Sequence, residues 1–291
     1  MGWRGVVGAD GAYARTHDDT RWDVTHPARG DLYAVTCVGD RLGWAVGAGG
    51  VILASQDGGA SWTPQPSPVT VALRGVRFFD ALSGVAVGDG GTVIVTRDGG
   101  QSWTARDVAT TVALHAVGAA PGGRLAWAVG ESGALRVSDD AAETFHAVST
   151  DVTVTLHGAS IDTLGRGYAV GERGTVLRLD GTVATRLAAP TSVTLRAVDV
   201  PDRADGDVAA LVVGDGGTLL VRELASDAPF RRLDGETAAD LHAALVTVGE
   251  GGTRLYVAGA MGTLLEREPN KTGFRALDLG VSGTWYGIED F

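Results

Sequence analysis

Seven residues with basic or phenolic side chains recur at one position of a repeated motif. The motif is Leu-x-[Gly/Ala]-[Val/Ala], and the last copy has Trp in place of Leu and Ile at the fourth position. Its second position holds, in order, Tyr33, Arg74, His115, His157, Arg196, His242 and Tyr286. None of the seven is acidic, although the net charge of the chain is −11. Guanidinium, imidazole and phenol groups hydrogen-bond strongly to carboxylates. If the fold gathers these side chains, we expect a local positive collar that receives an acidic or C-terminal segment of another protein. The alternative is that they only pack and bond between neighbouring repeat units.

Acidic residues recur at a second position, just after a Val-Gly pair. They are Asp10, Asp89, Glu131, Glu172 and Asp215. A ring of carboxylates could bind calcium through its oxygen atoms. We expect these residues at the tips of separate hairpins, too far apart to share an ion. No Cys/His cluster with zinc-ligand spacing occurs, so we expect neither a metal nor another cofactor.

The only cysteine, Cys37, excludes an intrachain disulfide. It follows apolar residues in a strand-like pattern, and no local signature supplies a companion base. We expect it to be a small buried hydrophobic residue.

The elements that position these residues form a repeat. A Gly-x-x-Gly turn occurs seven times, and its first glycines are 39, 41, 42, 41, 43 and 45 residues apart. A period near 42 fits propeller blades and some helical solenoids. Glycine costs about 1 kcal/mol in a helix interior relative to alanine, and no window of 12 residues here could form a stable amphipathic helix without several glycines. The repeat units are therefore β.

One unit, residues 73–107, shows four expected strands at residues 73–79, 84–88, 92–96 and 102–106. A three-residue loop with glycine at positive φ joins the second and third strands. The third and fourth strands are joined by Ser/Thr-x-Asp-x-Gly-x-x-Trp, in which Asp accepts hydrogen bonds from turn amides and Trp covers the hairpin. The matching structural residues are Asp57, Gly59, Trp62, Asp98, Gly100 and Trp103.

This turn resembles the Asp-box, or BNR, repeat, and the whole unit resembles the Ycf48-like family of photosystem II assembly factors. The stretch from Gly43-Trp44-Ala-Val-Gly47 to Trp62 follows that family's pattern closely. The resemblance implies a seven-bladed propeller and an arginine-rich surface that receives a partner protein. We match Arg74 and Arg196 to that surface.

Seven first strands predict seven four-stranded antiparallel blades in an all-β propeller. The seventh first strand lies at the C-terminus, and the N-terminal turn has no first strand before it. Residues 283–290 should therefore pair with residues 3–7, which closes the ring and removes an edge. We expect one domain over residues 1–291, with blades at about 32–66, 73–107, 114–149, 156–188, 195–233, 241–277, and 283–291 joined with 1–25.

Enzyme classes with Asp boxes fit the sequence poorly. Sialidases carry an early Arg-Ile-Pro motif that is missing here, and xyloglucanase-type enzymes pair two propellers around a cleft. Glycoside hydrolysis needs two carboxylates roughly 5 to 9.5 Å apart in a cleft. We expect no catalysis, and a carbohydrate-binding or glycoside-hydrolysing propeller stays as the alternative.

Charge and hydropathy exclude other partners. A net charge of −11 disfavours nucleic acid and anionic lipid, and no apolar run approaches the roughly 18 residues of a spanning helix. The N-terminus shows no signal peptide. We expect a soluble protein, cytoplasmic or exported after removal of a signal that this chain lacks. Its expected role is a non-catalytic platform for another protein, as an assembly factor or accessory subunit of a larger complex.

Overall fold

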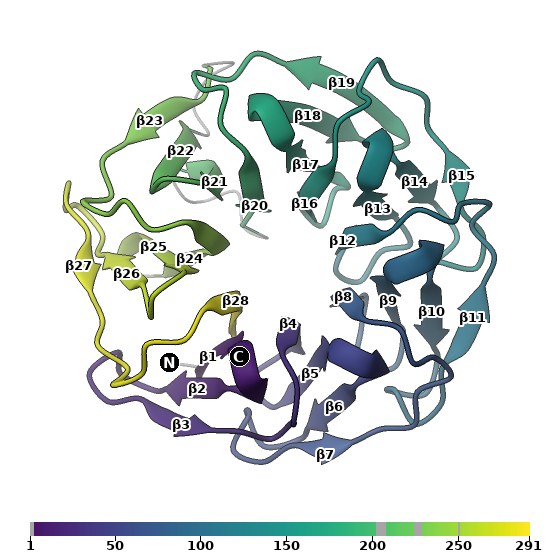
Figure 1. Cartoon of the computed structure of the whole chain (residues 1–291), viewed down its shortest axis with the longest axis horizontal. Coiled ribbons are helices and arrows are strands. Elements are labelled where there is room, and N and C mark those ends of the chain that lie inside the picture. The colour runs from purple at the N-terminus through teal and green to yellow at the C-terminus, as the bar shows by residue number, and fades with distance from the viewer. Residues whose placement is uncertain (1–2, 202–207, 224–228, 250) are drawn as a thin grey trace.

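The structure is a computed structural model that describes residues 3–201, 208–223, 229–249 and 251–291. Its strands form seven four-stranded antiparallel sheets arranged as a ring around a central axis (Figure 1). This confirms the predicted seven-bladed, all-β propeller. Within the described residues, no helix is long and apolar enough to cross a bilayer.

The blades are numbered by their innermost strands along the chain. Blade 1 contains β4 (Leu32–Val38), β5 (Leu42–Gly47), β6 (Ile52–Ser55) and β7 (Thr63–Pro64). Blade 2 contains β8 (Leu73–Phe78), β9 (Gly84–Gly88), β10 (Val93–Thr96) and β11 (Thr104–Arg106). Blade 3 contains β12 (Leu114–Ala119), β13 (Ala126–Gly130), β14 (Leu135–Ser138) and β15 (His146–Ala147). Blade 4 contains β16 (Leu156–Ile161), β17 (Arg166–Gly171), β18 (Thr175–Asp180) and β19 (Val183–Leu187).

The remaining blades follow the same order. Blade 5 contains β20 (Leu195–Asp199), β21 (Val208–Gly214), β22 (Thr218–Glu223) and β23 (Arg231–Leu233). Blade 6 contains β24 (Leu241–Gly249), β25 (Gly252–Gly259), β26 (Leu264–Arg267) and β27 (Arg275–Ala276). Blade 7 joins β28 (Trp285–Asp290) to β1 (Arg4–Gly8), β2 (Tyr13–Thr16) and β3 (Asp23–Thr25). Five short 3-10 turns lie between second and third strands: η1 (Ala9–Gly11), η2 (Ala48–Gly50), η3 (Asp89–Gly91), η4 (Glu131–Gly133) and η5 (Glu172–Gly174).

Strand direction divides the disc into two faces. Each innermost strand starts beside the turn that ends the second strand, as the pairing of Leu32 with Gly47 shows for blade 1. We call the face that carries η1–η5 the upper face. The Asp-Gly-Gly turns follow the third strands and therefore lie on the opposite, lower face.

The ring is closed as the sequence predicted. β28 pairs with β1, so residues from both chain ends share one sheet. The register places Arg4 opposite Asp290 and Val6 opposite Ile288. Closure of this kind leaves no unpaired edge between the first and last blades.

The core lies between the blades, where the faces of neighbouring sheets pack together. A typical cluster joins Val85 and Val87 of blade 2 to Val117 and Ala128 of blade 3. The third residue of each innermost strand is Gly or Ala because the innermost strands crowd together at the axis. A Cβ on Gly158 would lie 2.9 Å from the Cα of Ala197 in the next blade, so the innermost strands approach too closely for a side chain there.

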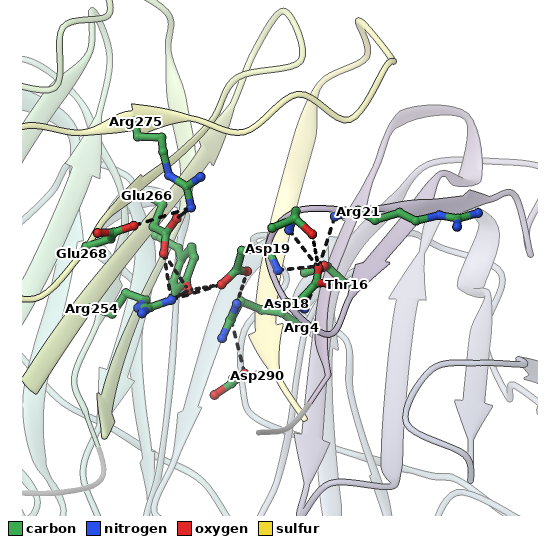
Figure 2. A network of polar contacts seen from close by, with 12 residues as sticks. Arg4, Thr16, Asp18, Asp19, Arg21, Arg254, Glu266, Glu268, Arg275 and Asp290 are labelled. Atoms are coloured by element: carbon green, nitrogen blue, oxygen red, sulfur yellow. Dashed lines mark hydrogen bonds and ion pairs between the residues drawn. The ribbon is translucent and has the colours of Figure 1, made fainter. Parts of the chain in front are cut away.

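A buried polar cluster joins blade 6 to the closing blade (Figure 2). Glu266, with a fully buried side chain, lies 3.0 Å from the Arg254 guanidinium and also pairs with Arg275. Asp19 of blade 7 pairs with Arg4, lies 3.2 Å from Arg254 and accepts a hydrogen bond from the Tyr256 hydroxyl at 2.9 Å. We call this group the clasp. It was not foreseen from the sequence, and it links residues more than 200 positions apart.

The turns between third and fourth strands share one hydrogen-bond pattern. Asp98 accepts bonds from the backbone and hydroxyl of Ser102, and these bonds hold the pKa of Asp98 below its usual value. Asp57 makes the same pair of bonds with Ser61. Gly59 and Gly100 have φ of 77° and 88°, a conformation that glycine adopts without strain. Trp103, which follows the turn of blade 2, is buried, and Trp62, which follows the turn of blade 1, is half-buried. Each turn with its Trp therefore stabilises the outer hairpin of its blade.

Candidate functional site

The seven side chains at the second motif position meet at the upper end of the central axis. They line one cavity of about 250 Å³, together with the small residues that follow them. Its polar lining consists of Tyr33, Arg74, Arg77, His115, His157, Arg196, His242 and Tyr286. We call this cavity the upper cavity and the seven motif residues the collar.

A β-bulge places every member of the collar. In blade 1, Leu32 pairs with Gly47 and Ala34 pairs with Val46, so Tyr33 is left out of the ladder. The same shift skips the second motif residue in each of the other six blades. A bulge bends the strand and redirects the extra side chain. It therefore explains why this residue, one place before a tightly packed Gly or Ala, has room for a large side chain.

Collar residues of neighbouring blades contact one another. The ring of Tyr286 lies 5.7 Å from those of both His242 and Tyr33, measured between centroids. The Arg74 guanidinium lies 5.6 Å from the centre of the Tyr33 ring. His115 and His157 meet edge to face at 5.4 Å. The expected alternative, packing between adjacent units, is thus present in the structure together with the shared cavity.

The arginines of the collar are paired with carboxylates, which corrects the expected positive ring. Arg74 forms an ion pair with Asp89, including a bond of 3.3 Å from Nη2 to Oδ2, and Arg196 pairs with Asp215. The turn carboxylates lie in the turns between second and third strands, as expected, and two of them contact collar arginines. We call the five turn carboxylates the outer ring, and its members Asp89 and Asp215 balance the charges of the two collar guanidiniums. They reach the collar because each turn folds back over the start of its own innermost strand.

The three histidines have lowered pKa values. Burial is the main cause for each of them. The positive charge of Arg74 lowers the pKa of His115 further, and that of Arg196 does the same for His157 and His242. At neutral pH the collar thus offers neutral imidazoles, two phenols and two neutralised guanidiniums. Burial also raises the pKa of Tyr286, which keeps this phenol protonated.

A second cavity, of about 280 Å³, lies at the lower end of the axis. Its lining includes Cys37, Arg77, Asp199, Glu289 and Asp290. Arg77 pairs with Glu289 at 2.8 Å. The prediction of a buried apolar cysteine is wrong in part, because Cys37 is half-buried and its Sγ lies 2.7 Å from the backbone oxygen of Asp290. We call this space the lower cavity.

The six turn residues predicted to be structural lie away from the upper cavity. Asp57, Gly59 and Trp62, and likewise Asp98, Gly100 and Trp103, do not line it. The structure thus separates a lower-face set that stabilises hairpins from an upper-face set that shares a cavity.

These features define a closed seven-bladed propeller with a polar cavity on its axis. No protein-family model matches the sequence, and no curated protein matches it. Among solved structures, the chain is similar to "YCF48 bound to D1 peptide", with a TM-score of 0.65, 18% identity, and coverage of 84% of this chain and 80% of that one. It is also similar to YCF48 from Cyanidioschyzon merolae, with a TM-score of 0.64, 17% identity, and coverage of 98% and 90%. Both similarities establish a shared fold with YCF48.

Proposed function

We propose that this protein is a non-catalytic interaction propeller that docks a segment of another protein at the upper cavity. The observation that carries the proposal is the collar. Seven bulges turn seven hydrogen-bonding side chains toward one axial cavity, and a core-packing role alone does not require that arrangement. Similarity to YCF48 in complex with a D1 peptide supports the choice of a peptide segment as ligand. The role in the cell is that of an assembly factor or accessory subunit of a larger complex.

The ligand group best suited to the collar is a carboxylate, from an acidic side chain or from a C-terminus. A guanidinium binds a carboxylate through two parallel hydrogen bonds. Arg74 already makes two bonds of this kind with Asp89, and Arg196 makes one with Asp215. A ligand carboxylate competes with these half-exposed partners. Tyr33 and Tyr286 add hydroxyl donors at the same level.

The lining of the upper cavity argues for binding without chemistry. Within the described part of the chain, the residues that line it include no serine, threonine or cysteine and no carboxylate, although carboxylates of the neighbouring turns pair with the lining arginines. The histidines therefore have no serine, threonine or cysteine side chain beside them to activate as a nucleophile, and the hydroxyls of the lining are the phenols of Tyr33 and Tyr286. The carbohydrate alternative predicts exposed aromatic rings on one face, but all seven tryptophans are buried or half-buried.

Quantitative capture from native extract tests this function. The purified protein serves as bait beside an Arg74→Glu/Arg196→Glu variant and a control, Arg186→Glu/Arg231→Glu, which reverses two exposed arginines on the outermost strands β19 and β23. We expect the collar variant alone to lose its partner. Equal capture by all three proteins would overturn docking at the collar, and binding of the collar variant to a glycan array would favour the carbohydrate alternative.

A further inference from the structure

The collar combines fixed charges that cancel with groups that gain charge in mild acid. Each of the two guanidiniums is matched by one carboxylate at any pH where both are ionised. Among the described residues that line the cavity, the three histidines are the side chains whose ordinary pKa lies between 5 and 8. A change of pH in this range therefore changes the charge of the collar through these histidines.

The arrangement of the imidazoles couples them to a ligand at the centre of the ring. His115 lies close to Arg74 and in edge-to-face contact with His157. His157 and His242 both lie within the electrostatic influence of Arg196, which occupies the blade between them. All three line the same cavity of about 250 Å³, so one bound group faces all of them.

Carboxylates of the outer ring face the histidines from the neighbouring turns. The charged and titratable groups around the three imidazoles are Tyr33, Arg74, Arg77, Asp89, Glu131, Glu172, Arg196, Asp215, Asp240 and Tyr286. Glu131 reaches 4.0 Å from Nε2 of His115. The negative charge of these acidic groups raises the pKa of the histidines and so partly offsets the lowering by burial and by the arginines.

We propose that the collar is a proton-coupled carboxylate receptor, which takes up protons on its histidines as it binds and releases the carboxylate when the pH returns to neutral. The inference rests on the proposed function in one respect, the upper cavity as docking site. A carboxylate held in a small, partly dehydrated cavity stabilises each imidazolium beside it. By linkage, protonation of these imidazoles then strengthens carboxylate binding by the same free energy.

The size of the effect follows from the number of protons linked. One linked proton changes the dissociation constant by up to about tenfold per pH unit. With at least one of three histidines linked, we expect affinity for a carboxylate to rise about tenfold or more between pH 7.5 and pH 5.5. Binding should also take up protons from the buffer.

The test uses three dye-labelled peptides with the purified full chain. The first is Gly-Ser-Gly-Ser-Ala with a free C-terminal carboxylate, the second is the same peptide amidated, and the third is the amidated peptide with Glu at its third position. Dissociation constants are measured by fluorescence anisotropy at pH 7.5, 6.5 and 5.5. Calorimetry in two buffers with different ionisation enthalpies counts the protons taken up.

Two variants isolate the histidines. His115→Gln/His157→Gln/His242→Gln keeps hydrogen-bonding side chains that cannot gain a proton, and His146→Gln changes an exposed histidine on β15. Single His→Gln variants replace the triple variant if its circular dichroism or melting curve shows loss of fold. We expect the triple variant to lose the pH dependence and His146→Gln to retain it.

The outcomes separate this inference from the proposed function. If the peptide with a free C-terminal carboxylate binds more tightly in acid and the amidated Glu peptide does not, the site recognises C-termini. If only the amidated Glu peptide binds more tightly in acid, the site recognises acidic side chains. Both results support the proposal if the amidated peptide without Glu does not bind. Equal affinity at all three pH values, or the same pH dependence in the triple variant, overturns proton coupling and leaves the docking function standing. No binding of either carboxylate peptide at any pH overturns the carboxylate site itself.

Discussion

The imidazole rings of His115 and His157 meet edge to face with their centroids 5.4 Å apart, although they belong to different blades. Burial lowers the pKa of both rings, so the unfolded chain binds protons there more readily than the folded protein. Stability of the unliganded protein should therefore fall as the pH drops below the ordinary histidine pKa of about 6.5.

We expect a lower melting temperature at pH 5.5 than at pH 7.5, and a smaller decrease in His115→Gln/His157→Gln. Differential scanning calorimetry at several pH values measures both. A decrease of the same size in the double variant and the wild type would contradict the assignment to these two histidines. A bound carboxylate peptide should reverse the trend, because it favours the protonated rings.

The Arg196→Gln variant should raise the pKa of two histidines and leave the third unchanged. Burial is the main reason why the pKa of His157 and that of His242 are lowered, and the positive charge of Arg196 lowers both values further. His115 instead has Arg74 as its cationic neighbour. Imidazole proton resonances followed by NMR against pH measure the three values. The matched variant Arg74→Gln should shift His115 upward, and a uniform shift of all three in either variant would refute the pairing.

The clasp should contribute strongly to the stability of the closed ring. Glu266→Ala removes the fully buried carboxylate that pairs with Arg254 and Arg275, and we expect it to cost about 2 kcal/mol of unfolding free energy, because Arg254 keeps Asp19 as a partner. Glu223→Ala is the control, because Glu223 pairs with Arg231 at an exposed site and should change stability by about 0.5 kcal/mol or less. Urea unfolding followed by fluorescence compares them. Equal effects of the two substitutions would show that the clasp adds nothing beyond a surface ion pair.

One hairpin turn carries backbone strain that glycine should relieve. Ala141 and Ala142 have φ of 64° and 66°, where the equivalent turns of blades 1 and 2 use glycine. Ala141→Gly should stabilise the protein by about 0.5–1 kcal/mol, because the left-handed conformation is costly for residues with a Cβ. Ala142→Gly should gain less, since Ala142 is fully buried and loses packing. Thermal unfolding measures the stability of both variants. Destabilisation by Ala141→Gly would contradict the inference that this turn is strained.

Close approach of the innermost strands should make Gly158 intolerant of a side chain. Gly158→Ala places a Cβ 2.9 Å from the backbone of Ala197, so we expect a loss of about 1–3 kcal/mol. Gly283→Ala is the control, because a Cβ there meets no atom within 4 Å and should be neutral or slightly stabilising. Denaturant titrations of the two variants compare them. A neutral Gly158→Ala would mean that the axis is less crowded than the structure shows.

The sequence by itself determined the number of blades, the strand order and the closure of the ring. Its repeat of about 42 residues carries these features locally, because turn glycines and apolar strands recur in each unit. The column from Tyr33 to Tyr286 could also be recognised, since symmetry places equivalent residues at one level around the axis.

Tertiary structure decided the charge and the chemistry of the site. The bulge that frees Tyr33 and its counterparts leaves no unambiguous mark in the sequence, because it depends on the pairing register of two strands. The balance between Arg74 and Asp89 depends on how a turn folds back over its own blade. The clasp between Asp19 and Arg254 forms only after closure brings blade 6 beside the N-terminal strands. Contacts between blades depend on packing across the whole ring, and therefore no single repeat unit encodes them.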